Sequence, residues 1–307
     1  RPNRSHSISL TLDNPSKWAI AISLSVIMLG VIGPTYLNQT NSFWPSALCV
    51  LVLSTIILLA DRGGIFGDYL IIYSSSLSIL LIHSLVSDGL VGTDIQKEFF
   101  YANRVLETGS IDLISSHHYS TVLSTQIILP MLSATTSLSL QDTLKILYPI
   151  IYSFIPVLLY FSYSQAFSRN IAFFSTLLTV FSFPFYTTML NVLRQGIAEV
   201  FLLSGIVLLL SSESLRMYRL RIFVIPFLIM MTVSHYSINY ILYPLLWLSY
   251  FTMIGLKQLG FIQDIFEDLE ISPLVEDSED DIPVVQFEND ALLDEEGIAT
   301  FEELQNR

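Results

Sequence analysis

Residues 69–88 read YLIIYSSSLSILLIHSLVSD and hold no Asp, Glu, Lys or Arg before Asp88. A helix needs about 20 largely apolar residues to cross the hydrocarbon core of a bilayer. The backbone finds no water there, so a helix, which bonds its own N–H and C=O groups, is the default structure. The stretch therefore predicts a membrane-spanning helix.

The composition of the whole chain agrees with a bilayer as solvent. Of the 307 residues, 52% are hydrophobic and 13% are charged, and the mean hydropathy is +0.60. Soluble domains carry about 25% charged residues. No basic patch with interleaved aromatic residues is present, which argues against a nucleic-acid partner. The single cysteine, Cys49, can form no internal disulfide, and no Cys/His spacing indicates structural zinc.

Seven further apolar stretches of similar length flank residues 69–88. The sequence therefore predicts an all-α, polytopic bundle of about eight transmembrane helices with one long loop, residues 89–143. Within this loop, residues 95–106 have apolar positions at helical spacing, and residues 121–140 are apolar but rich in Ser and Thr. The eight predicted spans are 18–37, 43–60, 69–88, 144–167, 171–190, 192–211, 217–235 and 238–255.

Loop charges predict the orientation, because cytoplasmic loops carry an excess of Lys and Arg. Arg216, Arg219 and Arg221 cluster between the sixth and seventh predicted spans, so this loop is expected in the cytoplasm. Counting back along the chain places the N-terminal residues 1–16 inside and the loop 89–143 outside. We therefore expect a multi-pass protein of the cell membrane whose long loop faces outward.

The chain after the last predicted span differs in composition. Its formal net charge of -13 comes largely from residues 261–307, whereas residues 17–260 form a nearly neutral membrane domain. Low hydrophobicity with high charge predicts disorder. We expect an acidic, disordered tail, which could be a solvated end or a docking segment for a basic partner.

The first candidate site follows the span at residues 69–88. The segment Gly92-Thr93-Asp94-Ile95-Gln96-Lys97-Glu98 places Asp94 and Glu98 four residues apart, on one face of a helix. Two carboxylates near an apolar surface can have their pKa values pushed apart, which suits a general base or a metal site. Thr93 or Asp94 could equally cap the helix.

Two further candidate sites lie at the outer ends of later spans. Arg194, Gln195 and Glu199 begin the sixth span, where a guanidinium could bind a lipid phosphate or only extend to the headgroups. His235 and Tyr236 end the seventh span, where they could bind a phosphate or serve as an interfacial anchor. All three groups fall on the outer side, and together they predict a site for a phosphate-bearing lipid.

An ordered set of short motifs resembles the GT-C glycosyltransferases, multi-span enzymes that take sugars from polyprenyl-phosphate carriers. The chain is similar to mainly archaeal membrane proteins placed near that superfamily. The likeness covers about residues 69–255. It rests on Gly92-Thr93-Asp94-Ile95 with Glu98, Phe99–Asn103, Leu147-Tyr148-Pro149, Arg194-Gln195, Ile197-Ala198-Glu199 and Ser234-His235-Tyr236-Ser237.

The resemblance implies a role for each matching residue. Asp94 would activate the acceptor hydroxyl as a base, with Glu98 supporting it, and Arg194 and His235 would hold the carrier phosphate. The expected partners are membrane lipid, a lipid-linked sugar donor and a glycan, lipid or protein acceptor. No cofactor is firmly implied, and a divalent metal on Asp94 and Glu98 is left open.

Other functions also fit the sequence. Glu199, Arg194 and His83 could line the path of a transporter or channel, since ionisable groups inside a membrane mark such paths. Transporters are often built from repeated halves, and no repeat is visible in the sequence. A non-catalytic membrane scaffold, or a truncated and inactive copy of an enzyme, would have the same composition.

Overall fold

The computed structural model describes residues 16–40, 42–44, 47–48, 50–51, 54, 64–111, 122, 124–211 and 222–258. Within these ranges the chain is helical and forms no strand. It separates into two compact units, Arg1–Leu246 and Trp247–Arg307, and the second is described only for the last turns of one helix. The predicted acidic tail, residues 261–307, lies outside the described residues.

Five helices in the described ranges are long and apolar enough to cross a membrane. A sixth crossing results if α9 (Arg169–Val180) and the segment Pro184–Asn191, bent by 51° at a short break, count as one span. These helices indicate a membrane-embedded protein. The five are α1 (Lys17–Thr40), α3 (Ile65–Leu85), the composite helix Leu140–Ala166, α11 (Leu193–Leu210) and Ser237–Leu256 within α14 (Tyr236–Gln258).

Most of the predicted spans coincide with these helices, and two do not. The span predicted at 43–60 falls largely outside the described residues. The span predicted at 217–235 corresponds to α13 (Val224–Ser234), which has 11 residues. At about 1.5 Å per residue this helix is too short to cross a bilayer alone. The described residues thus hold five or six of the eight predicted crossings.

Two long apolar stretches depart from a regular α-helix, and one of them is broken. The composite span runs through α6 (Leu140–Asp142), the π-helical turn η2 (Thr143–Leu147), α7 (Tyr148–Tyr152) and α8 (Phe154–Ala166). After α9, the π-helical turn η3 (Pro184–Thr188) and α10 (Met189–Asn191) lead into α11. Pro149, Pro156 and Pro184 lie in these stretches, and proline removes a backbone donor and bends a helix.

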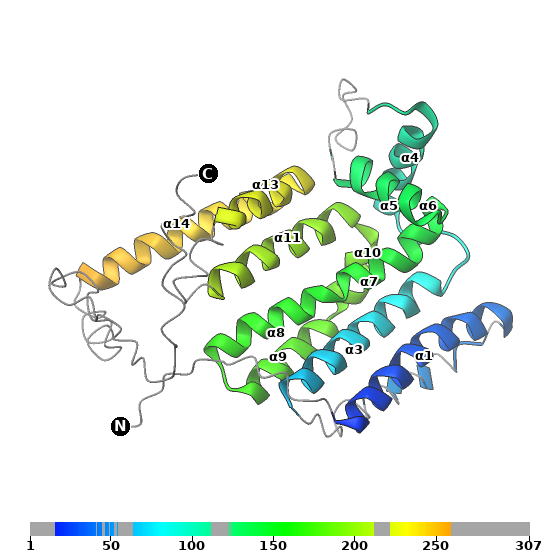
Figure 1. The fold of residues 1–307 in the computed structure, drawn as a ribbon, viewed down its shortest axis with the longest axis horizontal. Coiled ribbons are helices and arrows are strands. Elements are labelled where there is room, and N and C mark those ends of the chain that lie inside the picture. The colour runs from blue at the N-terminus through cyan, green and yellow to red at the C-terminus, as the bar shows by residue number, and fades with distance from the viewer. Residues whose placement is uncertain are drawn as a thin grey trace, which may run out of the picture. The chain divides into compact units, whose positions relative to one another are not determined.

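The helices of the first unit lie side by side, and two sets of contacts fix their directions (Figure 1). At one end, the fully buried Asp68 near the start of α3 accepts hydrogen bonds from Arg169 Nε at 2.5 Å and Nη2 at 3.0 Å, and from Tyr160 Oη at 2.6 Å. These bonds join the start of α3 to the later turns of α8 and the start of α9. The helices α3 and α8 therefore run antiparallel.

The opposite end of α3 meets the start of the composite span. Ser84 Oγ donates to the Lys145 carbonyl at 2.9 Å, and Gln141 Nε2 donates to the Asp88 carbonyl at 2.5 Å. Asn38, near the end of α1, donates to the Leu85 carbonyl at 2.8 Å. Because Asn38 and Leu85 both lie near the C-terminal ends of their helices, α1 and α3 run parallel.

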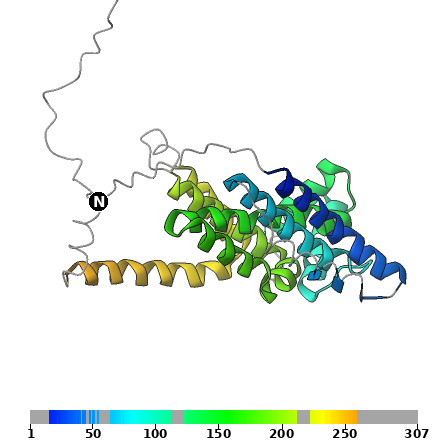
Figure 2. The same ribbon diagram turned by 90° about the horizontal axis from the view of Figure 1, so that it is seen from below.

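Small residues bring α1 and α3 close together along their length (Figure 2). A side chain added at Gly30 would overlap Ser78 of α3. Ser23 and Val26 of α1 and Ser74 of α3 are buried as well. Close approach at small residues is the usual way in which membrane helices gain contact, because lipid is as apolar as their larger side chains.

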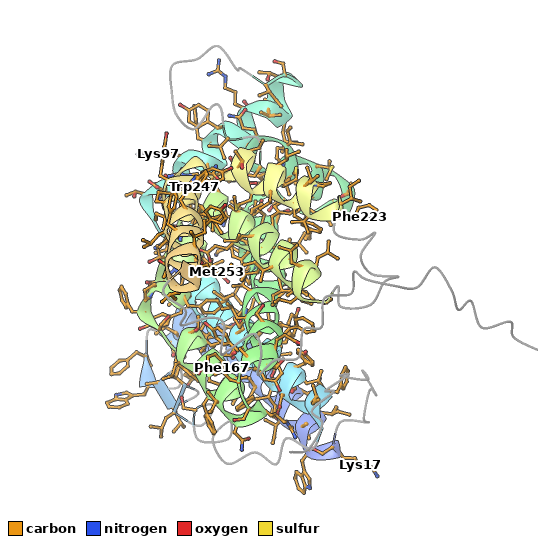
Figure 3. All side chains as sticks on the ribbon, turned by 90° about the vertical axis from the view of Figure 1, so that its left-hand side faces the viewer. Lys17, Lys97, Phe167, Phe223, Trp247 and Met253 are labelled. Atoms are coloured by element: carbon orange, nitrogen blue, oxygen red, sulfur yellow. The ribbon has the colours of Figure 1, made fainter. Side chains whose placement is uncertain are left out.

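A small helical segment covers one end of these helices. It consists of α4 (Thr93–Thr108), the π-helical turn η1 (Ser124–Ile128) and α5 (Leu129–Thr136). Buried Ile95 and Ala102 of α4 and Leu129 of α5 belong to the same apolar cluster as Tyr148 of α7. The helix predicted at 95–106 is thus present and slightly longer, and residues 121–140 contribute short helices that do not cross. Lys97 of α4 and Lys17 of α1 lie at opposite ends in Figure 3.

Candidate functional site

Arg194 joins the two carboxylates that the sequence singled out. Its Nη2 lies 3.0 Å from Asp94 Oδ2, and its Nη1 lies 2.9 Å from Glu98 Oε1. Asp94 and Glu98 occupy the first two turns of α4, and Arg194 is the second residue of α11. Two stretches about a hundred positions apart therefore meet in one ion network, which we call the Arg194 cluster (Asp94, Glu98 and Arg194).

The two carboxylates of the cluster have different surroundings. The Glu98 side chain is fully buried, whereas that of Asp94 is 28% exposed and that of Arg194 is 14% exposed. A ligand that approaches the cluster can therefore reach Asp94 and the edge of Arg194, while Glu98 is shielded. This asymmetry makes Asp94 the better placed of the two for contact with a substrate.

Glu98 also caps the beginning of α11. The backbone N–H of Leu193 donates to Glu98 Oε2 at 3.0 Å, which satisfies one of the first N–H groups of the helix. The positive end of the helix dipole favours a carboxylate there. Burial raises the pKa of Glu98 to about 8, against the opposing effects of Arg194 and of the Leu193 N–H. A protonated Glu98 would leave a neutral Asp94–Arg194 pair.

Tyr152 and Gly196 hold the beginning of α11 in place. The Tyr152 hydroxyl donates to the Leu193 carbonyl at 2.6 Å, and the fully buried tyrosine ring lies against Gly196. Any side chain at position 196 would overlap this ring. Val192, just before the helix, has the non-helical angles φ -129 and ψ 81. The ring thus fixes the backbone that carries Arg194.

Tyr148 lies beside the same network. In the sequence it stands out only as the middle residue of the Leu147-Tyr148-Pro149 motif. Its ring packs edge-on against Tyr152, with 5.4 Å between centroids. It is fully buried, close enough to Glu98 to feel its charge, and its hydroxyl has no hydrogen-bond partner among the described residues. Sequence reasoning gave neither tyrosine a role, since a tyrosine in an apolar run is usually a core residue.

Gly92 sets the start of α4 and so the position of Asp94. Its φ of +122 is in the region that favours glycine, and a Cβ there would lie 2.7 Å from Asn191 Oδ1 of α10. Gly92 is the N-cap residue of α4, and no side chain caps it. The prediction that Thr93 or Asp94 could be the N-cap is therefore wrong, because both residues lie inside the first turn.

The remaining predicted site residues are Gln195, Glu199, His235 and Tyr236. Gln195 Nε2 donates to Glu199 Oε1 at 2.8 Å, a pair one turn apart within α11. His235 follows α13, which packs against α11, and it is close enough to Arg194 to feel its charge. The Tyr236 side chain lies outside the described residues. The structure thus brings Asp94, Glu98 and Arg194 into direct contact, with His235 nearby.

The donor set of the cluster does not fit a divalent metal. Arg194 already binds one oxygen of Asp94 and one of Glu98. Across the described ranges, no three His, Cys, Asp or Glu side chains converge in a way that could hold an ion.

Comparisons with protein-family models, with curated proteins and with solved structures return no match to this chain.

Proposed function

We propose that this chain is a membrane glycosyltransferase of the GT-C kind, which transfers a sugar from a polyprenyl-phosphate carrier to a glycan, lipid or protein acceptor. The observation that carries the proposal is the Arg194 cluster. It places a partly exposed carboxylate beside an arginine at one end of a set of apolar helices. The lipid phosphate of such a donor would lie at this depth, at the boundary between bilayer and water.

The chemistry requires a base and a stabilised leaving group. The acceptor oxygen bonds to C1 of the sugar, the bond from C1 to the carrier phosphate breaks, and the acceptor proton passes to Asp94. Asp94 has one oxygen on Arg194, so the arginine orients the base. Negative charge grows on the leaving phosphate in the transition state, and fixed cations lower the barrier there.

Arg194 can supply this cation, but little of its guanidinium is open to a phosphate. Both of its terminal nitrogens bind carboxylates and its side chain is 14% exposed. A phosphate would therefore meet only the edge of the guanidinium, with His235 as a second nearby donor. Protonation of Glu98 would free positive charge on Arg194 for the phosphate, because the arginine would then balance Asp94 alone.

The proposal includes a topology. We place the N-terminus and the acidic residues 261–307 in the cytoplasm, and the Arg194 cluster on the outer side of the cell membrane. The parallel directions of α1 and α3 support one return crossing between them, which the span predicted at 43–60 would supply.

A transfer assay tests the activity. The purified chain in lipid vesicles would receive a panel of radiolabelled polyprenyl-phosphate sugars with membrane acceptors. Asp94→Asn should lower transfer by about 100-fold or more, the usual effect of losing a general base. Glu107→Gln is the matched control, because Glu107 is an exposed acid on the same helix whose carboxylate binds Asn103. An Asp94→Asn variant as active as the unchanged protein would contradict the assignment.

The Gln195–Glu199 pair favours transport as the second candidate function. Glu199 lies within the α11 span and is bonded to a neighbour in the same helix, and ionisable groups inside spans often mark a path for ions or solutes. If vesicles show no sugar transfer but take up a solute, and Glu199→Gln stops uptake while Asp94→Asn does not, transport replaces the enzyme.

A further inference from the structure

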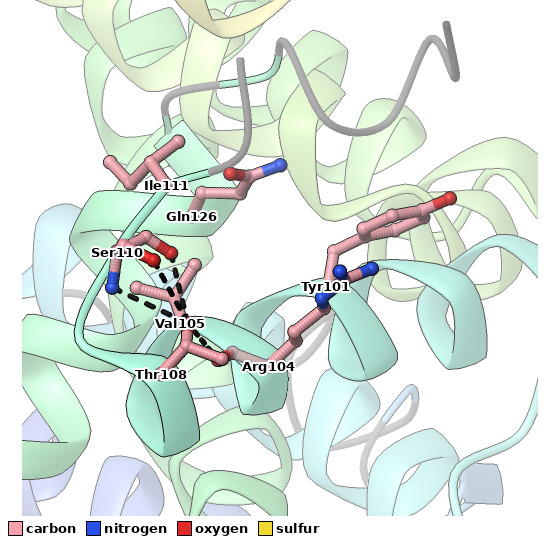
Figure 4. A pocket seen from close by; sticks show the side chains of 7 residues that line it. All are labelled: Tyr101, Arg104, Val105, Thr108, Ser110, Ile111 and Gln126. Carbon is pink, nitrogen blue, oxygen red and sulfur yellow. Dashed lines mark hydrogen bonds between the residues drawn. The ribbon is translucent and has the colours of Figure 1, made fainter. Parts of the chain in front are cut away.

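A second polar site lies further along α4, separate from the Arg194 cluster. It is a cavity of about 360 Å³ between the C-terminal half of α4, the residues after it and the turn η1. Figure 4 shows Tyr101 and Arg104 on one side of it and Gln126 and Ser110 on the other. None of the residues that line it contributes to the Arg194 cluster.

The wall of the cavity is rich in groups that bind hydroxyls and anions. The phenol of Tyr101, the guanidinium of Arg104 and the amide of Gln126 face it, together with the hydroxyl-bearing Thr108 and Ser110. Only Val105 and Ile111 are apolar. A site with several neutral hydrogen-bonding groups and one cation suits a ligand with many hydroxyls and one negative charge.

Arg104 differs from the other arginines that the structure describes. Arg169 is bonded to Asp68, and Arg194 binds two carboxylates. Arg104 is exposed and has no acidic partner within the described ranges. The nearest acid along its helix, Glu107, accepts a hydrogen bond from Asn103 at 2.6 Å. Within the described residues the guanidinium at the cavity is thus not neutralised by an acid.

The cavity and the Arg194 cluster share one face of α4. Asp94, Glu98, Tyr101, Val105 and Thr108 follow one another at intervals of four and three residues, which keeps them on the same side of a helix. Arg104 is ten residues beyond Asp94, a rise of about 15 Å along the helix. A ligand bound at Arg104 can therefore extend along α4 toward Asp94.

We propose that this cavity binds an anionic sugar group, carboxylated or phosphorylated, and that Arg104 recognises its charge. The role as acceptor subsite rests on the proposed glycosyltransferase function, whereas binding of the anionic sugar does not. In that role the negative group lies on Arg104, the hydroxyls bond Tyr101 and Gln126, and a hydroxyl further along an acceptor of more than one sugar reaches the partly exposed Asp94.

The experiment measures binding directly on the full chain in nanodiscs of zwitterionic phosphatidylcholine. The probes are glucuronate, glucose 6-phosphate, neutral glucose and inorganic phosphate, titrated by ligand-observed NMR. Arg104→Gln should weaken both charged sugars by about tenfold or more, the effect of a lost charge-assisted contact. Lys97→Gln, which removes an exposed cation of α4 that does not line the cavity, should change binding less than about twofold.

A second variant tests the cavity without altering its charge. Val105→Phe places a larger ring in the space and should weaken both charged sugars while Arg104 remains. Because Val105 is partly exposed and Arg104 is exposed, neither substitution removes a core contact. The thermal unfolding midpoint of each variant checks that it is folded.

Four results would overturn the inference. They are glucose binding as tightly as glucuronate, inorganic phosphate binding as tightly as glucose 6-phosphate, equal losses in Lys97→Gln and Arg104→Gln, and displacement of glucuronate by phosphatidylglycerol added to the nanodisc. The last would assign the site to a lipid headgroup.

The binding and transfer assays separate the two proposals. Asp94→Asn should keep sugar binding at the cavity while it loses transfer. Binding without transfer from any donor removes the glycosyltransferase and leaves the anionic-sugar site, and transfer without binding at the cavity removes the site alone.

Discussion

Glu98 and Asp94 are one helical turn apart, yet burial gives them different chemistry. Glu98 is shielded and bonds both Arg194 and the Leu193 N–H, while Asp94 keeps part of its surface open. A buried carboxylate is disfavoured in its charged form, and an exposed one is not. The pair thus provides one group that holds the site together and one that can meet a substrate.

The raised pKa of Glu98 predicts how stability depends on pH. Between its ordinary value of 4.5 and about 8, the folded chain keeps a proton that the unfolded chain releases. The contribution of Glu98 to the free energy of unfolding is therefore fully present below about pH 4.5 and declines as the pH rises to about 8. The thermal midpoint should fall over this interval more steeply in the unchanged protein than in Glu98→Gln. Equal slopes for the two proteins would refute the assignment.

Replacing Arg194 alone should lower the free energy of unfolding more than replacing Arg194 and Glu98 together. Above about pH 8, where Glu98 is ionised, Arg194→Gln leaves this carboxylate buried without its cation, and breaking a buried pair from one side costs about 3 kcal/mol or more. The double variant Arg194→Gln with Glu98→Gln keeps only the partly exposed carboxylate of Asp94 without a cation and no buried one, so it should be more stable than Arg194→Gln alone. Unfolding in mixed detergent micelles measures both values. If the loss of unfolding free energy in the double variant equalled the sum of the losses in the two single variants, Arg194 and Glu98 would not be coupled.

At the scale of the element, the position of the cluster depends on how α4 and α11 begin. Gly92 allows the chain to turn beside Asn191, and Gly196 allows Tyr152 to lie against the first turn of α11. Neither glycine is in the cluster. Each permits a close backbone approach that brings Asp94 or Arg194 to its place.

Gly92→Ala should therefore displace the start of α4. A Cβ at position 92 would strain a φ of +122 and meet Asn191 at 2.7 Å, which together should cost about 1–3 kcal/mol and reduce sugar transfer. Gly89→Ala is the control, because no atom lies within 4 Å of the Cβ it would add. Thermal unfolding and the transfer assay report the two effects. If Gly92→Ala behaved like Gly89→Ala, the close approach would have no role.

At the scale of the whole molecule, the proposed topology separates the two ends of the bundle. Lys17 at the start of α1 and Lys97 on α4 lie at opposite ends (Figure 3). In a Cys49→Ser background, a cysteine at position 97 should react with a membrane-impermeant maleimide on intact cells. A cysteine at position 17 should react only after the membrane is opened. Labelling of both positions from outside would contradict the topology.

The sequence alone determined where apolar helices form, because crossing length and the absence of charge are local properties. It also predicted a helix over residues 95–106 and placed Asp94 and Glu98 on one face, since helical periodicity depends only on spacing. The bend between α9 and η3 and the short α13 were not anticipated. Pro184 lies at the bend and marks a place where a helix can kink, but membrane helices tolerate proline, so its presence did not predict a break.

Only the tertiary structure decided what each charge touches. The partners of Arg194, the burial of Glu98, the bonds from Arg169 to Asp68 and the tyrosines beneath α11 all join residues far apart in the chain. A hydropathy profile carries no information on such contacts. They follow from which helix ends meet, and packing sets that after the spans have formed.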